Sequence, residues 1–195
     1  MLSVIIPTEN DERALVPTLA ALIPGASAGL ISEVIVADAG STDATAEVAD
    51  LAGAVVLVSQ AGRGARLREA ARSARAAWFL FLRPNIVLDL TWIAEAARFV
   101  EEAERDARLV DRAAVFRPAS IAAQRSTLAE ALALLRAALG GKPRPEQGLL
   151  IARRFYDELG GHRAGAADAE ADLLARLGRR RTVLLRSGAV NVAAK

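Results

Sequence analysis

An aspartate that directly follows a short apolar run is well placed for chemistry. Asp38 directly follows the run 33–37, and a turn at Gly40 is expected after it. Because the carboxyl end of a buried parallel strand faces the crevice where open α/β sheets bind ligands, Asp38 is a candidate ligand-binding residue. The alternative is that its carboxylate only caps this turn, as turn aspartates commonly do. The hydroxyls of Ser41 and Thr42 are expected to cap the next helix.

Other polar residues follow the ends of neighbouring apolar runs. Thr8 and Glu9 come after the first run. Asn85 comes after the fourth run, and Arg63 lies in a loop with two glycines after the third. Because the carboxyl ends of parallel strands meet at one edge, these residues are expected to gather around Asp38. A carboxylate suits a base or ribose, and a guanidinium with loop amides suits phosphate, so the pattern predicts a nucleotide site.

Apolar runs that alternate with amphipathic stretches predict an α/β fold with a mostly parallel central sheet and helices on both faces. The predicted strands span 2–7, 33–37, 54–58, 78–82, 113–117, 148–151 and 182–186. The predicted helices span 15 or 17 to 23, 42–51, 65–75, 92–107, 120–139, 153–159 and 168–177. Pro24 and Gly25 are expected to end the first helix. A single domain, 1–195, is expected because no repeat or long linker divides the chain.

Composition narrows the class of protein. The chain has 195 residues, 53% of them hydrophobic, which suits one globular domain with a full core. No apolar run approaches the ~20 residues of a membrane-spanning helix, and the first residues do not resemble a signal peptide. Cysteine is absent, which excludes disulfides and fits a cytoplasmic location, free or peripheral at the inner membrane face. The net charge of +2 is too small to indicate a nucleic-acid partner.

The first loop lacks the motifs of two other classes of nucleotide-binding enzyme. A dehydrogenase would carry G-x-G-x-x-G after its first strand, and a nucleotidyltransferase would carry a glycine-rich loop with a basic residue there. The loop 8–12 is acidic and contains no glycine. Neither class is therefore favoured.

A set of short motifs spread over most of the chain resembles one family. The motifs are the opening strand and loop 3–12, the Asp-x-Gly-Ser-Thr-Asp turn within 33–45, the Gly-Arg-Gly-Ala loop 62–65, the acidic-Gln-Gly element 146–148 and the Leu-Gly-Gly turn 159–161. Together they are similar to those of inverting family-2 glycosyltransferases of the GT-A fold, close to a short bacterial subgroup linked to arsenosugar-type biosynthesis. The combination is more specific than any one motif.

The resemblance implies that a nucleotide-diphosphate sugar, UDP- or GDP-linked, binds at the sheet edge. Asp38 would contact the base, Pro7 and Thr8 would form the pocket wall, and Arg63 would lie nearby. A carboxylate base would deprotonate an acceptor hydroxyl, which attacks the anomeric carbon in line and inverts it.

The resemblance also divides the domain into two halves. Residues 1–90 would bind the nucleotide, with Glu9 among the contacts. Residues 91–195 would face the acceptor, with Glu146 and Gln147 on that side. The sequence leaves open whether the acceptor is a small molecule, a lipid or a protein-bound group.

One position departs from the family pattern. Where the family has an aspartate that holds a divalent metal, the chain has Asn85, which lacks the charge that favours Mg²⁺ or Mn²⁺. The metal motif is thus degenerate, with Asn85 as a weak candidate ligand and metal binding weakened or absent. Arg83 adds a cation beside this spot and joins the nucleotide-site candidates; its alternative is a solvent-facing role. Either arginine charge replaces the metal, or the chain is a non-catalytic relative that binds a nucleotide or a partner protein.

The general base is expected in an acidic segment near the end of the chain. The family's Glu-Asp pair falls on Asp168 or Glu170, depending on a one-residue gap, and Asp172 is the third candidate. The alternative is that these carboxylates only begin a helix, where negative charge is favourable. His162 is interpreted as a turn residue, because it takes an apolar position of the family.

Overall fold

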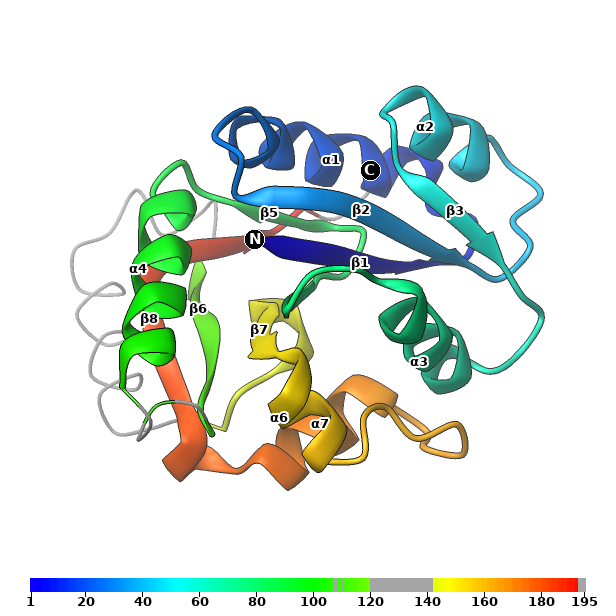
Figure 1. Ribbon diagram of the computed structural model, residues 1–195. Helices are drawn as coiled ribbons and strands as arrows, with labels where there is room; N and C mark the ends of the chain where they lie inside the picture. Colours follow the sequence, from blue (N-terminus) through cyan, green and yellow to red (C-terminus); the bar gives the residue numbers. More distant parts are fainter. Residues whose placement is uncertain (107–108, 110, 120–141, 193–195) are drawn as a thin grey trace.

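The computed structural model describes residues 1–106, 109, 111–119 and 142–192. Its strands are β1 (Leu2–Thr8), β2 (Ile31–Asp38), β3 (Val55–Val58), β4 (Trp78–Phe81), β5 (Ile86–Leu88), β6 (Ala113–Ala119), β7 (Leu149–Ala152) and β8 (Thr182–Asn191). Its α-helices are α1 (Glu12–Ser27), α2 (Thr45–Leu51), α3 (Arg63–Ser73), α4 (Trp92–Arg105), α6 (Arg153–Glu158) and α7 (Ala169–Leu177). Short 3₁₀ helices span Pro145–Gln147 and Arg179–Arg181. Figure 1 shows these elements around one sheet.

The strands form an 8-stranded sheet in the order β3-β2-β1-β4-β7-β6-β8-β5. Neighbours among β3, β2, β1 and β4 pair in parallel, which confirms the prediction for the first half of the chain. β7 pairs antiparallel with β4 and β6, and β5 pairs antiparallel with β8, so the sheet is mixed beyond β4. The parallel strands β1, β2 and β4 end at the same edge, where Thr8 is paired with Asp38.

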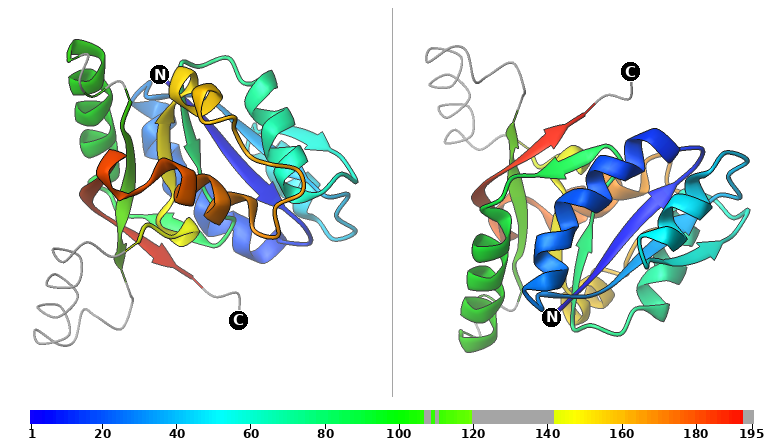
Figure 2. Two further views of the ribbon diagram at one scale, coloured as in Figure 1. Left: turned by 90° about the horizontal axis from the view of Figure 1, so that it is seen from below. Right: turned by 90° about the horizontal axis from the view of Figure 1, so that it is seen from above.

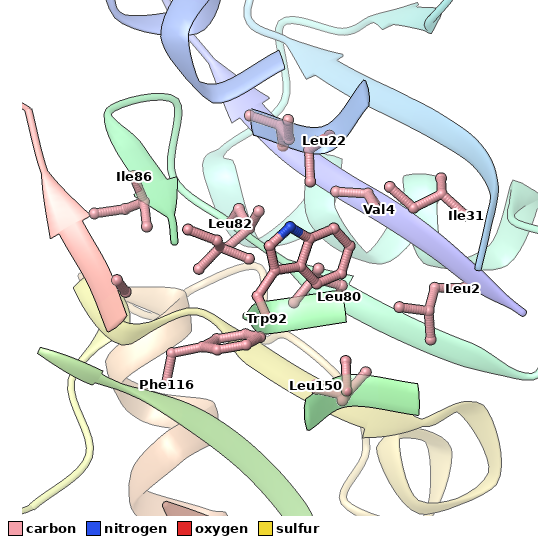
Figure 3. Packing of buried hydrophobic residues seen from close by; sticks show 14 of the residues in the cluster. Leu2, Val4, Leu22, Ile31, Leu80, Leu82, Ile86, Trp92, Phe116 and Leu150 are labelled. Atoms are coloured by element: carbon pink, nitrogen blue, oxygen red, sulfur yellow. The ribbon is translucent and has the colours of Figure 1, made fainter. Parts of the chain in front are cut away.

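Hydrophobic side chains fill both faces of the sheet. All of β1 is buried, and its side chains alternate: Val4 and Ile6 join the cluster under α1, α2 and α4, whereas Ile5 joins the cluster under α3, α6 and α7. Seen from below, α6 and α7 lie in front of the sheet, and seen from above α1 does (Figure 2). Trp92 fills the middle of the first cluster (Figure 3). Burial on both faces explains why the strands read as continuous apolar runs.

α1 departs from the prediction at both ends. It begins at Glu12 and continues through Pro24 and Gly25, where the sequence predicts a stop, to Ser27. Gly25 packs against the indole of Trp92, and a Cβ at this position would lie 2.5 Å from the ring. The glycine therefore serves close packing, and the prediction of a helix stop is wrong.

The remaining differences are smaller. β5 is missing from the sequence prediction, because three residues are too few for a recognisable apolar run. α2 begins at Thr45 rather than at 42, and β8 extends to Asn191. The helix predicted at 120–139 lies outside the described residues. Within the part of the chain that the structure describes, no helix is both long and apolar enough to cross a membrane.

Candidate active site

The loops after β1 and β2 are joined by hydrogen bonds where the strands end. The backbone N–H of Asn10 donates to Ser41 Oγ, and the side-chain oxygen of Asn10 accepts from the backbone N–H of Thr42. The backbone N–H of Asp11 donates to Thr45 Oγ1. These bonds hold the two loops together as one unit beside the end of β2.

Asp38 is buried at this edge, with 1% of its surface exposed. Its carboxylate accepts hydrogen bonds from the Thr8 hydroxyl at 2.8 Å, from the N–H groups of Gly40 and Ser41, and from Ser41 Oγ. Burial by itself raises the pKa of Asp38, but the bonds from Ser41 and Thr8 bring it below its ordinary value. Asp38 thus caps its own turn, which is the alternative role given for it in the sequence analysis. Its contact with the base of a nucleotide stays a prediction.

Ser41 and Thr42 do not cap α2, which corrects the sequence prediction. Ser41 Oγ donates to Asp38, and the N–H of Thr42 bonds the loop after β1. The carboxylate of Asp43 instead accepts from the N–H of Thr45, the first residue of the helix, at 3.0 Å. The hydroxyls of this turn therefore tie the loops together rather than begin the helix.

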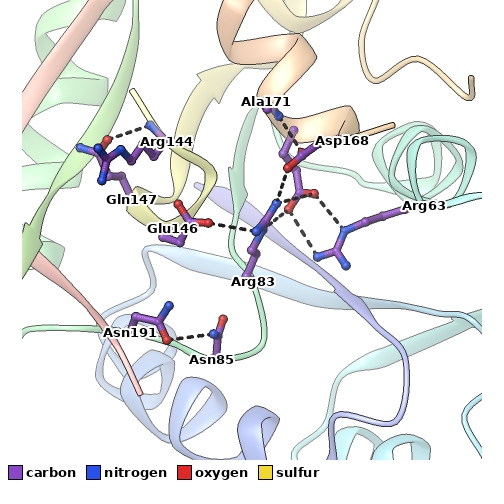
Figure 4. Close-up of polar contacts among 10 residues, drawn as sticks. Arg63, Arg83, Asn85, Arg144, Glu146, Gln147, Asp168, Ala171 and Asn191 are labelled. Carbon is purple, nitrogen blue, oxygen red and sulfur yellow. Dashed lines mark hydrogen bonds and ion pairs between the residues drawn. The ribbon is translucent and has the colours of Figure 1, made fainter. Parts of the chain in front are cut away.

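Arg83 lies at the centre of a group of carboxylates just beyond β4 (Figure 4). Its guanidinium bonds Glu146, Asp168 and Glu170, each at 3.0 Å. Arg63, at the start of α3, bonds the other oxygen of Glu170 at 2.9 Å. We call these five side chains the Arg83 cluster. Because the side chain of Arg83 is 23% exposed and makes three ion pairs, the solvent-facing alternative is wrong.

Backbone contacts fix the loop that carries Arg83. Its carbonyl accepts from the N–H of Ile86, and the carbonyl of Pro84 accepts from the buried Thr18 Oγ1 at 2.6 Å. Because Thr18 belongs to α1, this helix holds the loop at the end of β4. Burial lowers the pKa of Arg83, but hydrogen bonding and charge interaction with Glu170 raise it above its ordinary value. The guanidinium is therefore a permanent cation.

The start of α7 brings two carboxylates to the cluster. Asp168 is the N-cap of this helix and accepts from the N–H of Ala171 at 2.9 Å. Glu170 lies in the first turn, and its side chain is 11% exposed. Asp172, the third candidate base, pairs instead with Arg176 at 2.7 Å. Asp168 and Glu170 therefore both begin the helix and face the candidate site.

A close approach between α3 and the segment before α7 depends on Gly64. A Cβ at this position would collide with the carbonyl of Arg163 and lie 3.0 Å from the Cβ of Ala169. The glycine of the Gly-Arg-Gly-Ala loop thus brings the carboxylates of α7 within reach of Arg63. At Gly62 a Cβ would meet only an ordinary contact, at 3.5 Å from the carbonyl of Ala164.

An open hollow of about 270 Å³ lies beside the cluster. It is lined by Asp11, Ala14, Arg63, Arg83, Pro84 and Asn85. Arg63 and Asn85 therefore share one rim, as the prediction of a nucleotide site at this edge requires. The volume is near the lower end, roughly 300 Å³, of small-molecule pockets.

The hollow offers few oxygen ligands for a divalent metal. Of the residues lining it, Asp11 alone carries a carboxylate, and Asn85 donates its amide to Asn191 Oδ1 at 2.9 Å. Mg²⁺ and Mn²⁺ favour several oxygen ligands, whereas two guanidinium groups border this space. Among the described residues, no group of three or more His, Asp or Glu side chains is arranged to hold a metal. The described residues around the hollow thus offer a divalent metal one carboxylate, beside two fixed cations.

The predicted residues at the end of β1 lie in three different environments. Glu9 is exposed in the loop. Thr8 is fully buried, and its hydroxyl is used by Asp38. Pro7 lines a small internal cavity together with Glu170. Their contacts with a nucleotide stay predictions.

Gln147 holds the loop that carries Glu146. Its side chain is buried, donates to the carbonyl of Phe116 at 2.8 Å and accepts from the N–H of Arg144 at 2.8 Å. Both ends of the amide are thus used within the protein. The carboxylate of Glu146 is paired with Arg83. A contact of Glu146 or Gln147 with the sugar acceptor stays a prediction.

Two residues of the site were not singled out from the sequence. Asp11 lines the hollow with Arg63, and burial raises its pKa although the N–H of Glu9 and the charge of Arg63 oppose this rise. Its place in the polar loop 8–12 was the available signal. Thr18 carried no signal, because a single hydroxyl within a helix does not reveal which distant carbonyl it will bond.

Solved structures of similar fold include proteins bound to UDP or to a UDP-linked sugar. One is glucosyl-3-phosphoglycerate synthase from Mycobacterium tuberculosis, solved with Mn²⁺, UDP and glucosyl-3-phosphoglycerate. The two chains are 20% identical with a TM-score of 0.70, and the alignment covers 100% of this chain and 73% of the synthase. Another is a fragment of S. aureus TarS, solved with UDP-GlcNAc. It is 17% identical with a TM-score of 0.68, and the alignment covers 100% of this chain and 59% of the fragment. This chain thus spans less than two thirds of the TarS fragment. Among curated proteins, none matches the sequence significantly.

A family model extends the likeness from fold to sequence. The model described as glycosyl transferase family 2 matches residues 3–159, from β1 to the end of α6. The match includes Asp38, Arg63 and Arg83, whereas Asp168 and Glu170 lie beyond it. Because the match covers most of the chain and the fold is that of GT-A glycosyltransferases, the chain belongs to glycosyl transferase family 2.

Proposed function

We propose that the chain transfers a sugar from a nucleotide-diphosphate donor, UDP- or GDP-linked, to an acceptor hydroxyl with inversion. The observation that carries this proposal is that Arg63 and Arg83 line an open hollow at the end of the parallel strands, directly beside Asp168. Guanidinium forks suit phosphate oxygens. Membership of a glycosyltransferase family supports sugar transfer as the reaction.

In this proposal residues 1–90 bind the nucleotide and residues 91–195 face the acceptor. The diphosphate lies in the hollow near Arg83 and Asn85. The nucleobase lies toward Asp38. The carboxylate of Asp38 would exchange one of its hydrogen bonds within the turn for a hydrogen bond to the nucleobase. Because the turn supplies both N–H and hydroxyl donors to this carboxylate, losing one of them leaves the turn formed.

Asp168 suits the role of general base better than Glu170. The side chain of Asp168 is 46% exposed, whereas that of Glu170 is 11% exposed and bonds two guanidinium groups. Burial raises the pKa of Asp168, but the N–H of Ala171 and the charge of Arg83 bring it below its ordinary value. Asp168 is therefore ionised at neutral pH and can accept a proton from a hydroxyl within hydrogen-bond reach.

The reaction exchanges one bond to the anomeric carbon for another. Asp168 takes the proton of the acceptor hydroxyl while the acceptor oxygen bonds the carbon from the side opposite the diphosphate. The bond between the carbon and the diphosphate oxygen breaks, and its electron pair leaves with the nucleoside diphosphate. Fixed positive groups stabilise the charge that develops on this leaving group.

A donor screen tests the proposal. The chain is incubated with UDP-glucose, UDP-GlcNAc and GDP-mannose, and release of the nucleoside diphosphate is measured with and without hydroxyl acceptors. We expect turnover of at least one donor and a product of inverted anomeric configuration by NMR. Nucleotide binding without hydrolysis or transfer would contradict the proposal and favour the non-catalytic relative.

A further inference from the structure

The Arg83 cluster places fixed cations between acidic side chains and an open space. Arg83 and Arg63 supply two positive charges, and Glu146, Asp168 and Glu170 supply three negative charges. The same two guanidinium groups line the hollow. The cluster is therefore negative by one formal charge, so an added anion would meet repulsion unless it displaced a carboxylate.

We propose that Arg83 and Arg63 are resident cations for the donor's diphosphate, which replaces Glu146 and Asp168 on Arg83, so that binding requires no divalent metal. This inference rests on the proposed sugar-nucleotide function and concerns the same site. It agrees with the small number of carboxylates around the hollow, where the two arginines would supply the positive charge that a metal would otherwise supply.

Exposure decides which carboxylates give way. The side chains of Glu146 and Asp168 are 40% and 46% exposed, so water can solvate them when they leave Arg83. Glu170 is 11% exposed and bonds both arginines, so its release would leave a buried charge without a partner. Glu170 therefore stays and keeps the two guanidinium groups aligned.

Arginine chemistry suits this exchange. The guanidinium is planar, is charged at every working pH and binds carboxylates and phosphates with the same fork of N–H donors. Arg63 is 37% exposed and Arg83 is 23% exposed, so both are partly removed from water before any ligand arrives. Asp11, on the wall of the hollow, places one negative charge against the incoming diphosphate.

The exchange also prepares the general base. While Asp168 bonds Arg83, one of its oxygens is held by a cation and the other by the N–H of Ala171. Displacement by the diphosphate would free the first oxygen without disturbing the helix cap. The acceptor hydroxyl would then meet an available carboxylate only after the donor has bound.

Calorimetric titration of the full chain tests the inference without relying on catalysis. Inorganic pyrophosphate, UDP and GDP are titrated into the chain in EDTA and, separately, in Mn²⁺. We expect pyrophosphate and at least one of the two nucleotides to bind in EDTA, with an affinity that Mn²⁺ does not increase.

Variants separate the roles of the charges. Arg83→Gln should weaken pyrophosphate binding in EDTA about tenfold or more, because charge-assisted hydrogen bonds are lost, and Arg83→Lys should lie between it and the unmodified chain. Glu146→Gln should tighten binding, because a competing carboxylate is removed; a purely structural role of the cluster predicts no such gain. Arg154→Gln, from an exposed pair with Glu158, is the matched control and should leave binding unchanged.

The outcomes distinguish this inference from the proposed function. Pyrophosphate binding that requires Mn²⁺, or that Arg83→Gln leaves intact, would overturn the inference. If Arg83→Gln does not fold, Glu146→Gln decides, and unchanged affinity there would also overturn it. Binding in EDTA without any sugar transfer would support the inference while the proposed function fails. Transfer that EDTA abolishes and Mn²⁺ restores would support the function and reject the inference.

Discussion

The guanidinium of Arg83 and the carboxylate of Glu170 bond at 3.0 Å although 87 residues separate them in the chain. Arg83 follows β4, whereas Glu170 belongs to α7. Arg63 reaches the same carboxylate from α3. One buried carboxylate therefore links the segment proposed to bind the nucleotide with the segment proposed to face the acceptor.

This link predicts a stability effect for Glu170→Gln. The change leaves two partly buried guanidinium groups with weaker partners, so the free energy of unfolding should fall by about 1–3 kcal/mol, less than for a fully buried pair. Urea unfolding followed by circular dichroism measures it. Glu158→Gln, from an exposed i,i+4 pair, is the control and should leave the free energy of unfolding nearly unchanged. Equal losses in the two variants would contradict the link.

The role of Asp168 as base predicts that Asp168→Asn separates catalysis from folding. Asparagine caps helices about as well as aspartate, so the free energy of unfolding should be kept. Loss of the base should lower the transfer rate by about 10²–10⁴-fold. Initial rates at saturating donor, together with calorimetric nucleotide binding, measure both effects. Asp172→Asn should retain the rate, and the reverse ranking of the two variants would assign the base to Asp172.

Local sequence patterns predict most of the fold, because they report burial. The runs 34–37 and 78–82 are continuous and apolar, and both contribute to strands covered on two faces. The predicted stop at Pro24 and Gly25 failed because packing against Trp92 outweighed the low helix propensity of these residues. Whether a glycine ends a helix or admits a neighbour depends on residues far away in the chain.

The sequence predicts that Arg63 and Asn85 lie at one edge of the sheet, but not the contacts that are made there. Arg63 and Asn85 lie on one rim, because the ends of parallel strands share an edge. The partners of Arg83 lie 63, 85 and 87 residues away, so no local spacing reveals them. Sequence therefore predicts that Arg63 and Asn85 share an edge, whereas the ion pairs of Arg83 depend on how α7 packs against α3.

The close packing at Gly64 predicts different results for two neighbouring glycines. Gly64→Ala would force the carbonyl of Arg163 away and displace the start of α7, so stability should fall by about 1–3 kcal/mol. Pyrophosphate binding and transfer should fall with it, because Glu170 loses its position beside Arg63. Gly62→Ala meets only an ordinary contact and should change little. Thermal unfolding and titration of both variants test this, and equal effects would contradict it.

His162 predicts how stability depends on pH. The sequence interprets it as a turn residue, and it does lie in a bend, but the side chain is fully buried. Its Nδ1 lies 3.0 Å from Tyr156 Oη, and its Nε2 has no hydrogen-bond partner among the described residues. Burial, with smaller contributions from the charges of Arg176 and Arg68, lowers the pKa of His162 to about 3. The folded chain therefore holds this ring neutral.

The sign of the effect follows from where the proton binds. Below the ordinary histidine pKa of about 6.5 the unfolded chain takes up a proton that the folded chain refuses, so stability falls as the pH drops from 6.5 toward 3. Between pH 7.5 and pH 5 this costs about 2 kcal/mol. Urea unfolding at both pH values should show that loss in the unmodified chain beyond the loss in His162→Gln, in which the carboxylates still titrate but position 162 does not. Equal losses would mean that His162 can be protonated in the folded state, and that the ring is not sealed from water as its burial indicates.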